Sequence, residues 1–196
     1  FRPLNIGFDD KGNTLIASET VAFDANDFGE FYSVKPSEIV IFDGDTFKTK
    51  LLRSINRKYH CMFEFVYFSR PDSIFENRTI YEVRWNLGKE LASTYSTDAD
   101  VIVPIPDSSR PAAEAISRVT GIPVVEGLIK NRYIGRTFIM PKQEQREKNV
   151  KLKLNVVKSL VKGKKVLLVD DSLVRGTTIK RIVEMVRKAG AEKVYV

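Results

Sequence analysis

The sequence predicts an α/β protein in which a mostly parallel sheet with flanking helices follows an antiparallel β layer. In the second half of the chain, short apolar runs at residues 101–105 and 165–169 alternate with helical patterns, as expected for parallel strands buried on both faces. In the first half, alternating strand patterns flank turns rich in Asp and Gly, which is typical of β hairpins. With 43% hydrophobic and 29% charged residues, the composition is that of a globular chain.

The antiparallel layer consists of two predicted hairpins. The strands of the first cover residues 4–8 and 14–18, and those of the second cover 38–42 and 46–51. A polar, basic stretch at 53–58 then has the composition of a linker. We therefore predict two domains, over residues 1–55 and 56–196.

The second domain begins with a predicted helix that carries Ile80, Val83, Leu87 and Leu91 on one face, with Asp72 or Ser73 as its cap. The remaining predicted elements are strands at 101–105, 122–125 and 165–169, a strand that starts at Val194, and helices at 111–119 and 177–189 that end at Gly121 and Gly190. Parallel sheets bind ligands at the carboxyl ends of their strands, so we expect function in the loops after residues 105, 125 and 169.

Several protein classes are excluded at this level. The apolar runs fall far short of the roughly 18 residues that a membrane-spanning helix needs, so no membrane protein is expected. The single cysteine, Cys61, excludes an internal disulfide framework and predicts a reducing, cytoplasmic setting. The chain starts at Phe1 without a signal-peptide pattern or an initiator Met, which predicts a fragment.

The net charge of +7 is concentrated in one stretch. Residues 130–165 hold twelve Lys and Arg against two Glu, a local net of +10, which leaves −3 for the rest of the chain. The stretch is predicted as a loop followed by a helix, and its lysines are equally consistent with a solvated helix face. A compact cationic loop suits a polyphosphate ligand as well as a nucleic acid. No aromatic stacking series or recognition helix supports the nucleic acid, which is not the expected partner.

The loop after the strand at 165–169 combines two kinds of chemistry. Asp170 and Asp171 can bind the vicinal hydroxyls of a ribose, or a divalent cation that does so. Gly176 permits a close backbone approach, and Thr177 and Thr178 stand where a helix begins, which suits a phosphate monoester. Each half alone would be an ordinary turn or helix cap, but together they predict a site for ribose 5-phosphate.

Residues 166–178, Val-Leu-Leu-Val-Asp-Asp-Ser-Leu-Val-Arg-Gly-Thr-Thr, resemble the phosphoribosyl pyrophosphate loop of type I phosphoribosyltransferases. Segments at 67–73, 103–108 and 130–141 are similar, in that order, to segments of the glutamine phosphoribosylpyrophosphate amidotransferase family. Upstream, Arg2-Pro-Leu and residues 17–24 resemble the latter half of that family's N-terminal-nucleophile glutaminase domain. The family's nucleophilic cysteine and its oxyanion-hole Asn-Gly segment have no counterpart here, and the phosphoribosyltransferase domain stops early, at Val196.

The resemblance implies a glycosyltransferase that forms 5-phosphoribosylamine and pyrophosphate from phosphoribosyl pyrophosphate and glutamine-derived ammonia, in the first committed step of purine synthesis. It assigns phosphoribosyl pyrophosphate binding to Asp107, Ser108, Asp170, Asp171, Ser172, Val174, Arg175, Gly176, Thr177 and Thr178. Mg²⁺ would be held at Ser108, Asp170 and Asp171. Lys130, Arg132 and Arg136 would belong to a flexible loop that neutralises phosphate charge.

The same resemblance implies that Arg2 and Asp24 hold the two ends of glutamine, while Glu19 has no assignable role. Cys61 matches an iron–sulfur ligand in the cluster-bearing branch, so a [4Fe-4S] cluster and a buried small thiol both stay open. Expected partners are a second copy of the chain and purine nucleotides as feedback inhibitors. Two rival functions stay open: a salvage phosphoribosyltransferase acting on a free base, and a nucleic-acid-binding regulator on the same fold.

Overall fold

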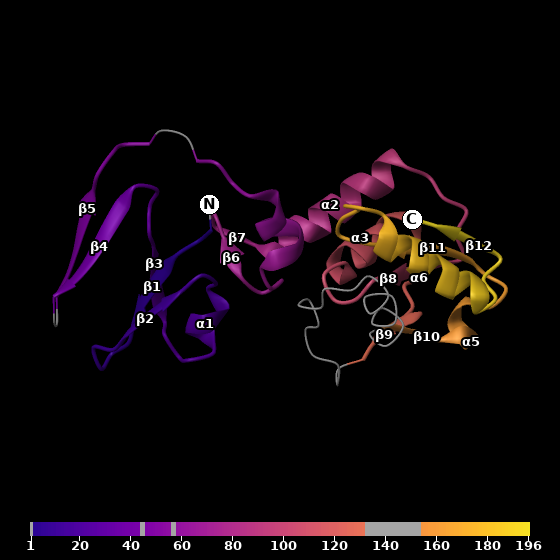
Figure 1. Ribbon diagram of the computed structural model, residues 1–196, viewed down its shortest axis with the longest axis horizontal. Helices are drawn as coiled ribbons and strands as arrows, with labels where there is room; N and C mark the ends of the chain where they lie inside the picture. Colours follow the sequence, from indigo (N-terminus) through magenta and orange to yellow (C-terminus); the bar gives the residue numbers. More distant parts are fainter. Residues whose placement is uncertain (1, 44–45, 56–57, 132–153) are drawn as a thin grey trace. The chain divides into compact units, whose positions relative to one another are not determined.

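The computed structural model describes residues 2–43, 46–55, 58–131 and 154–196 (Figure 1). The chain forms two compact units, Phe1–Val83 and Arg84–Val196, and each is described by itself. The division falls within helix α2 (Ile80–Thr94). The functional domain boundary near residue 55 stays a prediction.

The first unit contains the predicted antiparallel layer. Strand β1 (Asn5–Phe8) lies between β2 (Thr14–Ala17) and β3 (Glu30–Ser33), both antiparallel to it. The turn between β1 and β2 is closed by the Asp9 carboxylate, which accepts hydrogen bonds from the backbone amides of Lys11 (2.9 Å) and Asn13 (2.7 Å). A carboxylate that bonds the following backbone amides stabilises a turn, which explains why this hairpin was predictable.

The core of this layer is built around Phe23, in the short helix α1 (Val21–Asp24). Its ring stacks on Phe31 at 5.5 Å between centroids. A Cβ on Gly7 would lie 2.6 Å from the Phe23 ring, so only glycine fits at that position of β1. The second predicted hairpin is confirmed as β4 (Glu38–Asp43) paired with β5 (Thr46–Leu51).

Helix α2 begins later than the sequence predicts. It follows a π-helical turn, η1 (Glu64–Phe68), and a short hairpin of β6 (Ile74–Phe75) and β7 (Arg78–Thr79). The Thr79 amide donates to the Glu82 carboxylate at 3.1 Å, and the Glu82 amide donates to the Thr79 hydroxyl at 3.2 Å. This reciprocal pair is a capping box, so the prediction of Asp72 or Ser73 as the cap is wrong.

The buried stripe of α2 is also shifted from the predicted one. Ile80 is buried as predicted, but Leu87 and Leu91 are 41% and 49% exposed, whereas Arg84 and Gly88 are buried. A Cβ at Gly88 would lie 2.4 Å from the backbone oxygen of Ala112 in helix α3 (Arg110–Thr120). The physical reason for the shift is this close helix approach, which selects the stripe with the smallest residue rather than the most apolar one.

The second unit contains the predicted parallel sheet, in the order β12–β11–β8. Strand β8 covers Val101–Pro104, β11 covers Lys165–Val169 and β12 covers Lys193–Tyr195. The strand expected at 122–125 is reduced to a single parallel bridge between Val124 and Ile102. Pro123 lacks an N–H group and only accepts a hydrogen bond, from the Ile102 amide at 2.9 Å, which explains the shortening.

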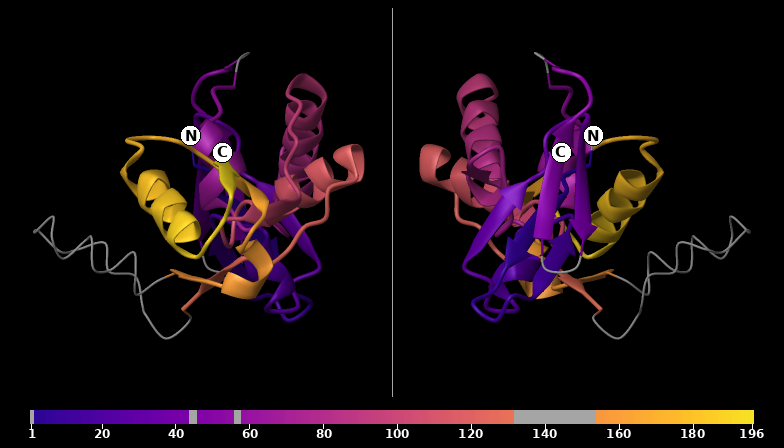
Figure 2. Two further views of the ribbon diagram at one scale, coloured as in Figure 1. Left: turned by 90° about the vertical axis from the view of Figure 1, so that its right-hand side faces the viewer. Right: turned by 90° about the vertical axis from the view of Figure 1, so that its left-hand side faces the viewer.

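Helices cover both faces of this sheet, as Figure 2 shows. On one face, Val101 and Val103 form a core with Ile182 and Val186 of α6 (Thr177–Lys188). On the other face, Ile102 packs against residues of α3. Alternate residues of β8 therefore enter opposite cores, which confirms the prediction of a strand buried on both sides.

An antiparallel pair that the sequence analysis did not anticipate lies beside the sheet. Strand β9 (Leu128–Lys130) pairs with β10 (Leu154–Val156), which is followed by the short helix α5 (Lys158–Val161). The predicted loop residues Arg132 and Arg136 lie outside the described residues. No helix in the described part of the chain is long and apolar enough to cross a bilayer.

Replacing Gly88 with alanine tests the contact between α2 and α3. The added methyl would overlap the backbone of Ala112, so the helices must separate. We expect the Gly88→Ala substitution to lower the free energy of unfolding by about 1–3 kcal/mol, despite its better helix propensity. Urea unfolding measures the change, with Gly29→Ala as the control because a Cβ there would meet no atom within 4 Å. Equal stability of the two variants would contradict this account.

Candidate functional site

Two loops begin side by side at the carboxyl end of the parallel sheet. Val169 of β11 and Pro104 of β8 are register partners at the ends of their strands. The Ile105 amide donates to the Val169 carbonyl at 2.9 Å, which extends the pairing by one step. The loops at 105–109 and 170–176 therefore meet where the sequence predicts a site.

Asp171 joins these two loops. Its carboxylate accepts a hydrogen bond from the Ser108 hydroxyl on the neighbouring loop and another from the Ser172 hydroxyl at 2.6 Å. Ser108 and Asp171 are 63 residues apart in the chain. The structure thus brings together three of the residues predicted to bind phosphoribosyl pyrophosphate.

Asp170 lies in a less polar environment than its neighbour. It is half-buried at the end of β11, and its carboxylate accepts a hydrogen bond from the Asp171 amide at 3.0 Å. Burial raises the pKa of Asp170, and the negative charge of Asp171 raises it further. Both effects disfavour the ionised form of Asp170, so a hydroxyl donor or a cation bound next to its carboxylate would stabilise that form.

The carboxylates suit a metal ion that is shared with a ligand. The described residues contain no group of three or more His, Cys, Asp or Glu side chains able to hold a metal by themselves. Mg²⁺ is commonly bound by one or two carboxylates together with waters and substrate phosphates. Asp170, Asp171 and the Ser108 hydroxyl fit this second mode.

The other half of the loop offers backbone donors. Gly176 adopts a left-handed conformation (φ 70°) at the start of α6, and no side chain caps the helix there. Thr177 and Thr178 are exposed, as are the three residues before Gly176. Uncapped N–H groups and the positive end of the helix dipole favour an anion. The prediction that a helix begins at this point is confirmed.

Lys130, at the end of β9, brings a positive charge to the loop at 105–109. Its ammonium group pairs with the Asp107 carboxylate at 2.7 Å, and both side chains are more than half exposed. Asp107 also follows a cis peptide bond from Pro106. Sequence reasoning identified both residues but missed their pairing, because strand β9 was not predicted.

The residues expected to bind glutamine lie in the first unit. The Arg2 guanidinium pairs with the buried Glu64 carboxylate at 3.4 Å and lies 5.8 Å from the ring centroid of Phe68. Asp24 is exposed at the end of α1. Cys61 is a half-buried free thiol. The roles predicted for Arg2, Asp24 and Cys61 stay predictions.

Comparison with known proteins agrees with this geometry. The family described as the phosphoribosyl transferase domain matches residues 72–196. The amidophosphoribosyltransferase of Methanothermobacter thermautotrophicus is 49% identical over 97% of this chain and 40% of its own length. That of Bacillus subtilis is 47% identical over 100% of this chain and 41% of its own length. The chain thus spans less than half the length of these relatives.

Solved structures give the same result. The glutamine phosphoribosylpyrophosphate amidotransferase of B. subtilis, complexed with ADP and GMP, superposes with a TM-score of 0.86 at 45% identity, covering 98% of this chain and 42% of its own. A structure described as the allosteric regulatory enzyme of purine biosynthesis also gives 0.86, at 47% identity over 100% of this chain and 42% of its own. The predicted fold and family resemblance are confirmed. The chain therefore belongs to the phosphoribosyltransferase family.

Proposed function

We propose that the protein is an amidophosphoribosyltransferase. It forms 5-phosphoribosylamine and pyrophosphate from phosphoribosyl pyrophosphate and ammonia released from glutamine, in the first committed step of purine synthesis. The observation that carries the proposal is the Asp171 carboxylate, which connects the loops after β8 and β11. The loop after β11 also leads to the start of α6, where no side chain caps the helix. One ligand with ribose hydroxyls and a phosphate matches both halves of this loop.

The proposed reaction is a substitution at ribose C1. The bond from C1 to the pyrophosphate oxygen breaks, and pyrophosphate leaves with the electron pair. A bond from C1 to the ammonia nitrogen forms, and the surplus proton passes to solvent. Ammonia is already a nucleophile, so the reaction requires little general-base assistance.

The residues of the chain act by positioning and by charge. Asp170 and Asp171 would accept hydrogen bonds from the ribose hydroxyls, and the amides at the start of α6 would hold the 5-phosphate. The loop at 105–109 and Lys130 would face the pyrophosphate, where positive charge stabilises the leaving group. When bound, Mg²⁺ adds positive charge to the same leaving group.

Similarity upstream of the phosphoribosyltransferase domain favours an amidotransferase over a salvage enzyme. The family match begins at residue 72, whereas the amidophosphoribosyltransferase relatives match 97–100% of the chain. A salvage enzyme would share the loop at 170–178 but should lack the segment at 2–24. A nucleic-acid-binding regulator receives no comparable support.

Finer features extend this proposal. The B. subtilis enzyme was solved with ADP and GMP, which supports purine nucleotides as regulators of this protein. We further propose a cytoplasmic homo-oligomer. Cys61 is the only cysteine of the chain, so a [4Fe-4S] cluster would need its other ligands from elsewhere.

Substitution of the two carboxylates tests the proposed function. Asp171→Asn should weaken binding of phosphoribosyl pyrophosphate with Mg²⁺ about tenfold or more, because a hydrogen bond to a charged group contributes about 1.5–3 kcal/mol. Calorimetric titration measures the affinity. Asp10→Asn, an exposed position in the first unit, is the matched control. Unchanged affinity in Asp171→Asn would remove the central claim.

Asp170→Asn should weaken ligand binding similarly but raise the melting temperature of the ligand-free protein at pH 7. The folded-state pKa of Asp170 lies above its ordinary value, so its ionised form opposes folding at neutral pH. The stability gain should shrink as the pH falls through the raised pKa toward the ordinary Asp value of about 3.9, and it should vanish only below that value, where the wild-type carboxyl is protonated in both states. Thermal unfolding between pH 7 and pH 4 tests this, and a gain independent of pH would contradict it.

The ion pair between Lys130 and Asp107 generates a separate prediction. If Lys130 meets the pyrophosphate group, Asp107 competes with the ligand for it. Asp107→Asn should tighten binding of inorganic pyrophosphate with Mg²⁺ by up to about fivefold, the range of an exposed ion pair. In a Lys130→Met background the same change should have a smaller effect. Weaker binding in Asp107→Asn would instead show that Asp107 itself binds the ligand or its metal.

A further inference from the structure

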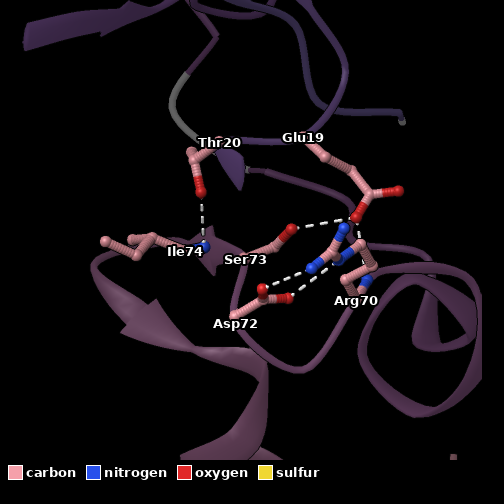
Figure 3. Close-up of polar contacts among 6 residues, drawn as sticks. All are labelled: Glu19, Thr20, Arg70, Asp72, Ser73 and Ile74. Carbon is pink, nitrogen blue, oxygen red and sulfur yellow. Dashed lines mark hydrogen bonds and ion pairs between the residues drawn. The ribbon is translucent and has the colours of Figure 1, made fainter. Parts of the chain in front are cut away.

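Glu19 and Thr20, which lie one residue beyond the end of β2, hold a loop more than fifty positions away in the chain (Figure 3). One Glu19 carboxylate oxygen accepts hydrogen bonds from the Arg70 backbone amide at 2.8 Å and from the Ser73 hydroxyl at 2.9 Å. The Thr20 hydroxyl oxygen accepts a hydrogen bond from the Ile74 amide at 2.7 Å. Three donors of the 70–74 segment are thus satisfied by two consecutive residues.

These contacts act on the backbone of the segment. Thr20 and Ser73 are each only 2% exposed, so removing a partner would leave a buried polar group unsatisfied. The Arg70 guanidinium binds the Asp72 carboxylate at 2.7 Å and 3.1 Å, whereas its backbone amide binds Glu19. The Arg70 carbonyl accepts from the Ser73 amide at 3.1 Å, which closes a tight turn.

The same segment fixes the start of α2. The Ser73 carbonyl accepts a hydrogen bond from the Ile80 amide at 2.9 Å, and the Pro71 carbonyl accepts one from the Tyr81 amide at 2.7 Å. These are the first amides of the helix, which lack acceptors within the helix itself. Glu19 and Thr20 therefore hold the segment that determines where α2 begins.

The hydrogen bonds from the 70–74 segment to Glu19 and Thr20, which we call the anchor, also cross a boundary in the family comparison. The phosphoribosyl transferase domain match begins at Asp72, inside the 70–74 segment, whereas Glu19 lies in the part that resembles a glutaminase domain. The hydrogen bonds of Glu19 and Thr20 therefore join the glutaminase-like part to the first residues of the phosphoribosyltransferase part.

We propose that Glu19 and Thr20 are positioning residues for the glutamine-dependent reaction. The inference rests on the proposed function, because it assigns them to the transfer of ammonia between the two activities. The hydrogen bonds of their side chains described above all go to the 70–74 segment. Their loss should uncouple glutamine use from phosphoribosyl transfer without impairing phosphoribosyl transfer itself.

The test compares glutamine-dependent with ammonia-dependent formation of phosphoribosylamine in the full-length gene product. In Glu19→Ala the ratio of the two rates should fall about fivefold or more, because two hydrogen bonds to a carboxylate are lost. The ammonia-dependent kcat/KM for phosphoribosyl pyrophosphate should stay within about twofold. Glu19→Gln should retain most of the ratio, since an amide oxygen can accept the same two bonds.

Glu30→Ala provides the matched control, because Glu30 is an exposed glutamate on β3 in the same unit. Thr20→Val removes the acceptor of the Ile74 amide and should lower the ratio in the same direction. In both Glu19→Ala and Thr20→Val, hydrogen exchange should accelerate at the amides whose acceptors are lost, Arg70 and Ile74 respectively.

An equal fall of both rates in Glu19→Ala would show a general loss of structure and overturn the inference, as would an unchanged ratio. Absence of ammonia-dependent synthesis in the wild-type protein would instead overturn the proposed function. In that case, unchanged hydrogen exchange at Arg70 and Ile74 in the two variants would show separately that Glu19 and Thr20 do not hold the 70–74 segment.

Discussion

The parallel pairing of β8 with β11 is the constraint on which the rest of the site depends. Its register places Pro104 opposite Val169, so the two strands end together and their loops start at one edge of the sheet. The pairing is stabilised from both faces, because alternate β8 residues pack against α6 and α3. A slip by one residue would exchange the two cores and separate Ser108 from Asp171.

The loop after β11 places two negative side chains and the positive end of a helix within nine residues. Its first part places two carboxylates together, and burial and the charge of Asp171 both disfavour ionisation of Asp170 and raise its pKa. Its last part presents the positive end of α6 without a capping side chain. A single ligand with hydroxyl and phosphate groups would interact favourably with both parts of the loop. Binding sites often retain such locally unfavourable arrangements at a cost in stability.

The start of helix α2 is held by a series of hydrogen bonds that connect it to residues far away in the chain. Its first amides are held by Thr79, Glu82 and the carbonyls of the 70–74 segment, and that segment is held in turn by Glu19 and Thr20. Further along, Gly88 lets the helix approach the backbone of α3. The start of α2 is therefore fixed by polar contacts and its middle by close packing.

The sequence by itself determined the features that depend on local signals. The Asp9 turn, the apolar strands 101–104 and 165–169, the glycines that end α3 and precede β12, and the start of α6 after Gly176 each arise from neighbouring residues. Family resemblance also located the loop that contains Asp170 and Asp171. Only the tertiary structure decided the partners of Asp171, Lys130 and Glu19, which lie 63, 23 and about fifty positions away along the chain. It also decided the buried stripe of α2, where contact with Ala112 outweighed the apolar pattern. Such contacts depend on sheet register and helix packing, and these are properties of the folded chain rather than of any local segment.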